Sequence, residues 1–169
     1  FIHQTNVDKS LYNIVFSYEI AGEVNEGNLE LSLDKLSNKH QILKSVIREE
    51  AGMGILVFDE SIHHDINYFD VSDLPLDMQE EKVNHFVKEE AERQFDLGNG
   101  PLLSITLVKR NESEYQLLCN IHHIIFDGWS IPLLINDWFA IYEGIENGDR
   151  NDRDNQAIQY GDYALWQKN

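Results

Sequence analysis

Cysteine and proline are scarce in this sequence, and each scarcity excludes a class of protein. Of the 169 residues, one is cysteine (Cys119) and three are proline. An internal disulfide framework and a proline-rich, low-complexity chain are therefore both excluded. No cysteine–histidine cluster has the spacing of a zinc site, so we expect no metal. A lone cysteine is typical of a reducing compartment, so we expect the protein to be cytoplasmic.

Positive charge is equally scarce. Thirteen lysines and arginines stand against thirty acidic residues, which gives a formal net charge of −17. Such a surface repels phosphate backbones and anionic lipids. No apolar run approaches the ~20 residues of a membrane span, and residues 1–10 lack the basic and apolar regions of a signal peptide. We expect neither a nucleic acid nor a membrane as partner.

What the sequence does contain is an ordinary globular composition, with 42% hydrophobic and 11% aromatic residues. Its length predicts a single domain with a core of its own. The chain begins with Phe1 and stops at Asn169 directly after an aromatic-rich stretch, so we interpret it as a piece of a longer protein.

Patterns of β-branched and aromatic residues predict several extended segments. They cover residues 12–21, 45–49, 54–59, 64–70, 102–109 and 115–126. The acidic loop between the third and fourth suits a hairpin, and the last two, joined by a polar turn, are expected at the centre of a sheet.

Apolar residues at helical spacing predict four helices. The first contains Leu29, Leu33 and Leu36. The other three cover residues 77–95, 131–145 and 157–167. Asn28 is the predicted cap of the first helix, and Asp77 with Glu80 forms a capping-box pattern for the second. Together the elements predict an α/β two-layer sandwich with a largely antiparallel or mixed sheet.

Polar residues interrupt the last predicted strand at residues 120–130, and this stretch carries the candidate chemistry. Because side chains alternate along a strand, His122 and His123 cannot both face one substrate. Alternation places His123 on the apolar face and gives His122 possible hydrogen-bonding neighbours. Both could instead be satisfied core histidines, whereas diverging histidines without a third ligand make a poor metal site.

The residues after the histidines fit a strand-to-helix turn. Asp127 could cap the following helix or order the histidine loop, and Gly128 permits a tight turn and close approach of a ligand. Trp129 is interpreted as a core residue rather than a substrate contact, and Ser130 as a helix-terminal cap. Cys119 lies mid-strand and is expected to be buried and inert.

Four segments in order resemble the condensation domains of nonribosomal peptide synthetases, which share the chloramphenicol acetyltransferase fold. They are His-His-Ile-Ile-Phe-Asp-Gly at 122–128 (HHxxxDG), Lys-His-Gln-Ile-Leu-Lys-Ser at 39–45 (RHxxLRT), Phe-Asp-Leu-Gly-Asn-Gly-Pro-Leu-Leu at 95–103 (FDLxxGPLL) and Tyr-Gly-Asp-Tyr-Ala-Leu-Trp-Gln at 160–167 (YxDYAxWQ). The resemblance covers the N-terminal lobe of a two-lobed domain without its first SxAQxRLW-type motif, and the C-terminal lobe is absent.

The resemblance implies an acyltransferase that forms amide bonds. A donor thioester on the phosphopantetheine arm of an upstream peptidyl carrier protein is attacked by the amine on a downstream carrier, and the domain itself binds no cofactor. His123 falls on the residue nearest the reacting amine, with His122 and Asp127 as structural support and Gly128 beside the donor thioester. We expect a buried, neutral His123 that positions the amine first and accepts its proton second.

Other matched residues are candidates for lining the substrate tunnel or for structural roles. They are Trp129, Ser130, Lys39, His40, Lys44, Tyr160, Asp162 and Trp166. Lys39 and Lys44 replace the arginines of RHxxLRT, and lysine cannot reproduce a bidentate guanidinium contact. We expect both lysines to be structural, because they flank a helix-to-strand junction.

Three other functions remain open. An epimerisation domain shares HHxxxDG and would invert a carrier-bound α-carbon, and another HxxxD acyltransferase would use free acyl-coenzyme A. A non-catalytic lobe would dock a carrier protein or recruit a partner enzyme. Because one lobe supplies only half of a tunnel, the isolated chain is predicted to be inactive.

Overall fold

The computed structural model describes residues 9–148 together with residues 159, 162 and 166. Most of the helix predicted at 157–167 therefore lies outside the described residues. The elements in chain order are η2 (Lys9–Tyr12), β1 (Asn13–Ala21), α1 (Glu26–Lys39), η3 (Gln41–Lys44), β2 (Ser45–Glu50), β3 (Met53–Phe58), β4 (Ile66–Asp70), α2 (Leu76–Glu92), β5 (Leu103–Asn111), β6 (Glu114–His122), η4 (Gly128–Ser130) and α3 (Ile131–Glu146).

A four-stranded mixed sheet with the order β1-β6-β5-β4 forms the centre of the structure. Strands β1 and β5 flank β6 and run antiparallel to it. The outer strand β4 runs parallel to β5. The prediction that the last two strands are central is therefore confirmed, and β6, from Tyr115 to His122, is buried throughout.

The hairpin predicted between the third and fourth extended segments is wrong. Strand β3 pairs instead with β2 in a separate two-stranded sheet, through a turn at Ala51 and Gly52. Both turn residues have positive φ, at 51° and 78°, which is the geometry of a tight antiparallel turn. The acidic loop after β3 consequently connects two sheets.

Two predicted helix caps are also wrong. The side chain of Asn25 accepts a 3.0 Å hydrogen bond from the backbone N–H of Asn28, so Asn25 is the cap and α1 begins three residues earlier. Helix α2 begins after Pro75 with no side-chain cap and ends at Glu92 rather than near Phe95. A proline before the first turn has a fixed φ that suits this entry into a helix.

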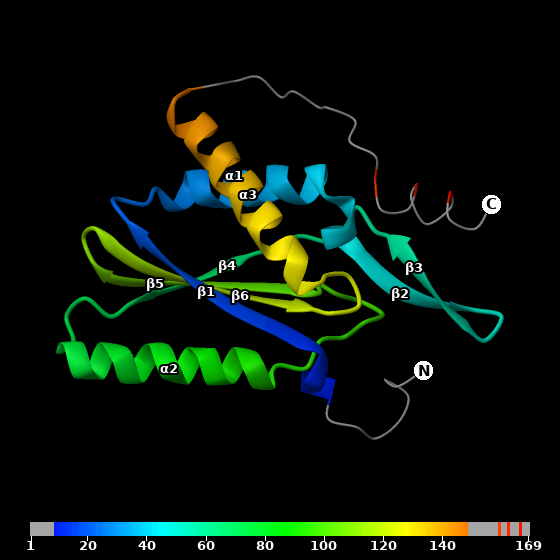
Figure 1. Cartoon of the computed structure of the whole chain (residues 1–169), viewed down its shortest axis with the longest axis horizontal. Coiled ribbons are helices and arrows are strands. Elements are labelled where there is room, and N and C mark those ends of the chain that lie inside the picture. Colours follow the sequence, from blue (N-terminus) through cyan, green and yellow to red (C-terminus); the bar gives the residue numbers. More distant parts are fainter. Residues whose placement is uncertain (1–8, 149–158, 160–161, 163–165, 167–169) are drawn as a thin grey trace.

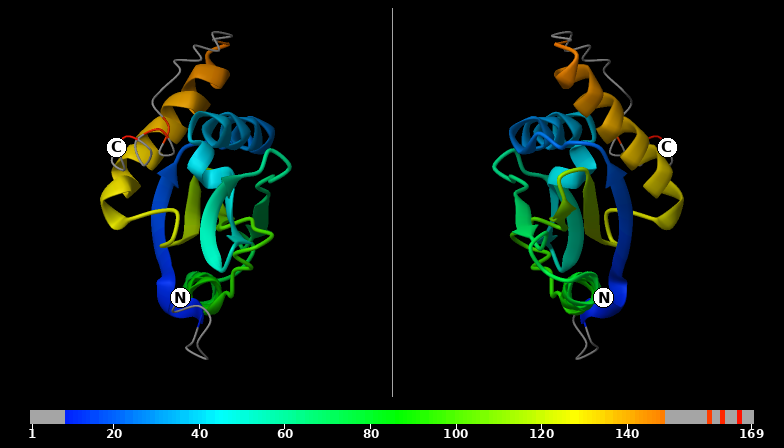
Figure 2. Two further views of the ribbon diagram at one scale, coloured as in Figure 1. Left: turned by 90° about the vertical axis from the view of Figure 1, so that its right-hand side faces the viewer. Right: turned by 90° about the vertical axis from the view of Figure 1, so that its left-hand side faces the viewer.

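Helices cover both faces of the sheet (Figures 1 and 2). Helices α1 and α3 pack on one face, where the larger hydrophobic core lies, and α2 packs on the other, where Val83 contacts Val108 and Val71 in a smaller cluster. The α/β class with a mixed sheet is confirmed, and the second helical face adds a third layer to the expected sandwich.

The core between α1, α3 and the sheet fixes the elements that carry the candidate site. Trp138 of α3 is 1% exposed, and its indole N–H donates a 2.8 Å hydrogen bond to Ser32 of α1. Cys119 of β6 is buried in the same core, where burial raises the pKa of its thiol. Its predicted burial is confirmed, and a buried, protonated thiol is a poor nucleophile.

Candidate active site

His122 is the last residue of β6 and is only 3% exposed. Its Nδ1 accepts a 3.1 Å hydrogen bond from the backbone N–H of Ile124. Its ring lies between Tyr12 and the edge of Phe95, with centroids 6.2 and 6.1 Å away. These contacts support the predicted structural role, because they fix both the ring and the turn that follows.

His123 lies just beyond the strand, and its side chain is exposed, so the expected burial is wrong. Strand alternation stops at His122, where a turn closes with a 3.1 Å bond from Ile125 N–H to His122 O. The His123 N–H donates to Tyr12 O at 2.8 Å. The backbone of His123 is therefore fixed while its imidazole is open to a ligand.

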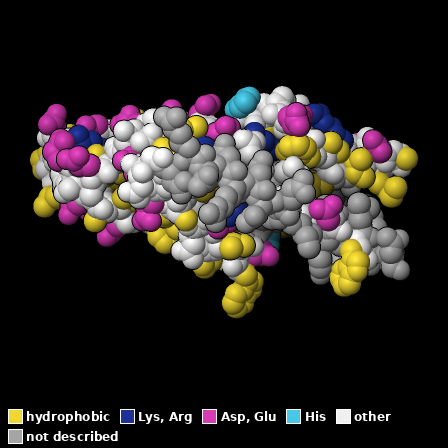
Figure 3. All heavy atoms as spheres, turned by 90° about the horizontal axis from the view of Figure 1, so that it is seen from above, with side chains coloured by type: hydrophobic (Ala, Val, Ile, Leu, Met, Phe, Trp, Pro, Cys, Tyr) yellow, Lys and Arg dark blue, Asp and Glu magenta, His cyan; other side chains and the backbone are white. Residues whose placement is uncertain are grey.

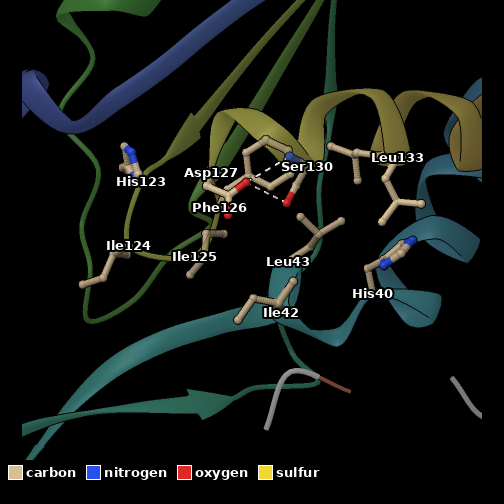
Figure 4. A pocket seen from close by; sticks show the side chains of 11 residues that line it. His40, Ile42, Leu43, His123, Ile124, Ile125, Phe126, Asp127, Ser130 and Leu133 are labelled. Atoms are coloured by element: carbon tan, nitrogen blue, oxygen red, sulfur yellow. Dashed lines mark hydrogen bonds between the residues drawn. The ribbon is translucent and has the colours of Figure 1, made fainter. Parts of the chain in front are cut away.

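A pocket of about 340 Å³ lies beside this turn. Its walls are the turn at residues 123–127, the first turn of α3 with Leu133 and Leu134, and the segment from His40 to Leu43. Figure 4 shows His123 and His40 on opposite sides of the pocket, with aliphatic side chains between them. The site thus combines two imidazoles with a mainly apolar lining.

Asp127 orders the turn between β6 and α3. Its Oδ1 accepts 2.9 Å hydrogen bonds from both the backbone N–H and the hydroxyl of Ser130 (Figure 4). The predicted capping by Asp127 is confirmed, although it caps the short η4. Ser130 precedes α3 without a side-chain capping bond, so its own predicted capping role is wrong. A Cβ at Gly128 would meet open space.

Replacing Asp127 should weaken this turn in a graded way. We expect Asp127→Ala to lower the free energy of unfolding by about 1 kcal/mol, because both bonds to Ser130 are lost. Asp127→Asn should cost only a few tenths of that amount, since asparagine is an equally good cap. Chemical denaturation of the two variants measures the difference, and equal losses would contradict the capping role.

Trp129 is 94% exposed, so its predicted place in the core is wrong. The turn through Gly128 directs it outward, and Ile124 and Leu133 beside the pocket are exposed as well. Hydrophobic side chains also project among scattered acidic groups on the surface seen in Figure 3. Apolar groups therefore border the pocket on its outer side.

Lys39, His40 and Lys44 lie where the sequence placed them, at the junction after α1. Lys39 Nζ and His40 Nε2 both bond to Asp137 Oδ2 of α3, at 2.8 and 2.7 Å. Lys44 is buried and donates to Asn38 Oδ1 at 2.7 Å. These contacts support structural roles for both lysines and place His40 in the pocket wall.

Asp137 is a partner that the sequence did not reveal. Burial raises the pKa of its carboxyl, but hydrogen bonds and charge from Lys39 and His40 outweigh burial and hold the pKa below its usual value. Asp137 is therefore an ionised acceptor for both side chains. No sequence pattern links it to His40, which lies 97 positions away.

Of the YxDYAxWQ segment, the structure describes Asp162 and Trp166, and neither lies at the pocket. Asp162 accepts a 3.0 Å bond from the backbone N–H of Gln159, and Trp166 is 73% exposed. Neither lines the pocket, and Tyr160 lies outside the described residues. Gln159, which the sequence did not single out, does contact the site, because its side-chain amide bonds to the backbone of Lys39 and Gln41 on either side of His40.

A polar network under β6 was also missed. Glu90 of α2 receives two 2.8 Å bonds from Arg93 and one of 3.0 Å from Ser104. Asn120, two residues before His122, donates to the Glu90 carbonyl at 2.6 Å. Asn13 of β1 donates to the Arg93 carbonyl at 2.8 Å. The network joins α2 to three strands on the face opposite the larger core.

Within residues 9–148 and the three further described positions, no group of three histidine, cysteine or acidic side chains could hold a metal ion. In the same part of the chain, none of the helices has the length and apolar character of a membrane span.

The sequence is similar to parts of much longer proteins. The chain is 33% identical over 168 residues to a linear gramicidin synthase of Brevibacillus parabrevis, covering 99% of this chain and 2% of that protein. It is 29% identical over 168 residues to the phosphinothricin tripeptide synthetase PhsC of Streptomyces viridochromogenes, covering 99% and 16%. The chain thus spans only a small part of these relatives.

Several solved structures have the same fold as this chain. SgcC5 of Streptomyces globisporus superposes with a TM-score of 0.81 at 18% identity, covering 98% of this chain and 38% of that one. The starter condensation domain of the rhizomide synthetase RzmA gives 0.79 at 16% identity, covering 86% and 35%. The family model described as Condensation domain matches residues 1–169, so the chain belongs to the condensation domain family.

Proposed function

We propose that this chain takes part in nonribosomal peptide synthesis, where it helps to form an amide bond between two carrier-bound substrates. The observation that carries the proposal is His123, the second residue of HHxxxDG, whose imidazole is open to a ligand and borders a mainly apolar pocket. The relatives are synthetases, which supports substrates borne on phosphopantetheine arms of upstream and downstream peptidyl carrier proteins.

The chain is proposed to be the N-terminal lobe of a two-lobed domain. It covers 32–38% of the solved structures to which it is similar, among them SgcC5 and the X-domain from teicoplanin biosynthesis. The exposure of His123 and of the apolar residues around the pocket supports a C-terminal lobe as the second wall. The isolated chain should therefore be inactive.

The proposed reaction needs no redox or metal step. The amine nitrogen of the acceptor attacks the carbonyl carbon of the donor thioester, a C–N bond forms, and the C–S bond breaks. His123 holds the attacking amine and accepts a proton from it, and that proton passes to the departing thiolate. Positioning can remove about 7–11 kcal/mol from the barrier, whereas base catalysis contributes about 10²–10⁴-fold, so positioning is the larger part.

A second candidate function is docking without catalysis. The X-domain from teicoplanin biosynthesis has been solved in a complex with OxyB, and this chain superposes on that X-domain with a TM-score of 0.80 at 21% identity. A lobe of the same fold could thus recruit a partner enzyme. The intact HHxxxDG segment favours catalysis, and epimerisation of the donor stays a third candidate.

One experiment separates the three functions. The complete protein that carries this chain is mixed with a donor carrier and an acceptor carrier, both loaded, in a single turnover. Amide formation supports condensation. Exchange of the donor α-proton with solvent, without an amide, supports epimerisation. If neither occurs with several donors, docking is the better explanation and the proposed condensation function is rejected.

A further inference from the structure

His40 is held in place from several directions. Its backbone N–H donates to Leu36 O at 2.9 Å, where α1 ends. The side-chain amide of Gln159 bonds on both sides of it, donating to Lys39 O at 3.2 Å and accepting from Gln41 N–H at 3.3 Å. A side chain on so constrained a backbone is well suited to present one atom to a ligand.

The imidazole is oriented by Asp137. Its Nε2 lies 2.7 Å from Asp137 Oδ2, and because that carboxylate is ionised, Nε2 is the donor of this bond. In the neutral ring, Nδ1 is then left as a lone-pair acceptor. Among the residues that the structure describes, none forms a hydrogen bond to His40 Nδ1.

The pocket between the two histidines suits a particular ligand chemistry. Ile42, Leu43 and Leu134 supply aliphatic walls, and His40 and His123 lie on opposite sides of the pocket (Figure 4). An apolar passage with a few placed polar groups binds a slender, mainly aliphatic chain and fixes its orientation through its polar atoms. An N–H or O–H hydrogen complements an Nδ1 acceptor, and an amide-linked chain supplies the N–H.

We propose that His40, oriented by Asp137, is a substrate-binding residue whose Nδ1 accepts a hydrogen bond from an amide N–H of the carrier-borne substrate chain. This inference rests on the proposed function and adds to it a contact on the wall opposite His123. Asp137 is the positioning residue, because it acts on the substrate only through His40.

The competing explanation is that His40 only ties α1 to α3 through Asp137. Two substitutions separate these roles. In His40→Gln the side-chain amide can reach the Nε2 position and keep the bond to Asp137, but the Nδ1 acceptor is lost. In His40→Asn an oxygen can occupy the Nδ1 position, but the side chain is too short to reach Asp137. The two explanations therefore predict opposite results.

The test measures binding and stability separately. The complete protein is titrated with a carrier protein whose arm ends in an unreactive, amide-linked aminoacyl group, and the dissociation constant is read by fluorescence anisotropy. We expect His40→Gln to weaken binding about 3- to 10-fold with little change in thermal stability. His40→Asn should bind within about 2-fold of wild type although it unfolds more easily.

Two further variants complete the design. Asp137→Asn should weaken binding as much as His40→Gln, because a carboxamide no longer fixes the proton on Nε2. His85→Gln, on the exposed surface of α2, is the matched control and should bind as wild type does.

The inference is overturned if His40→Gln binds as wild type while His40→Asn loses affinity together with stability. Because the readout needs no turnover, wild type that binds the carrier but forms no amide would count against the proposed reaction and leave the His40 contact standing. If wild type turns over normally but His40→Gln binds the carrier as wild type does, the proposed reaction is supported and the His40 contact is rejected.

Discussion

In the complete protein, His123→Ala should reduce the single-turnover rate of amide formation by at least about 100-fold. Two titratable side chains of HHxxxDG, His123 and Asp127, are both exposed and beside the pocket. Asp127 caps the turn, so the imidazole of His123 is the one left to act on a substrate. Its removal takes away both the proposed hydrogen bond to the amine and the proposed proton acceptor. Since the side chain is exposed, the free energy of unfolding should change by less than about 0.5 kcal/mol.

The size of the loss in His123→Gln separates the two parts of the mechanism. Glutamine can still hydrogen-bond the amine but cannot accept its proton at neutral pH. If positioning is the larger part, this variant should keep its rate within about 10-fold of wild type. His85→Ala is the matched control for loss of an exposed histidine. A wild-type rate in His123→Ala would remove His123 from the mechanism altogether.

Glu90→Ala should lower the free energy of unfolding by about 2–3 kcal/mol, because several hydrogen bonds to a buried carboxylate are lost. Glu90 is 4% exposed and holds Arg93 and Ser104 through its side chain. Its replacement leaves the buried groups around it without their charged partner. Denaturation in urea measures the change. Glu89→Ala, one position earlier and exposed, should cost less than about 0.5 kcal/mol.

The Glu90 network should also give stability a dependence on acid pH. Burial raises the pKa of Glu90, but bonds from Arg93, Ser104 and Asn120 outweigh burial and hold the pKa below its ordinary value of 4.5. A carboxylate with a lowered pKa in the folded state stabilises the protein above the ordinary pKa, and this stabilisation is lost as the pH falls through the lowered one. Glu90→Gln should therefore flatten the stability profile below about pH 4.5. An unchanged profile would contradict the assigned role.

The sequence predicted well those features that depend on neighbours along the chain. Periodicity located the strands and the three described helices, and strand alternation separated His122 from His123 although it wrongly buried His123. Alternation failed there because β6 ends at His122, and sequence patterns rarely fix an element's last residue. Trp129 was misplaced for a related reason, since a turn and not a helix face sets its direction.

Features that depend on distant pairing were not predictable. The parallel pairing of β4 with β5 joins Ile66 to Ile105, and nothing local distinguishes it from a hairpin partner. The bond from His40 to Asp137 spans 97 positions, and that from Asn13 to Arg93 spans 80. Such contacts arise only once the layers have packed, which is why both the His40–Asp137 pair and the Glu90 network were missed.

The place of Cys119 gives the protein a built-in chemical reporter. This thiol is the single cysteine of the sequence, lies in a central strand, and is both covered by the core and held protonated by burial. Alkylating reagents act on the thiolate, so they can modify Cys119 only after the sheet around it has opened. A cysteine engineered at the exposed Trp129 position would consequently accept a fluorescent label selectively, without prior removal of the native thiol.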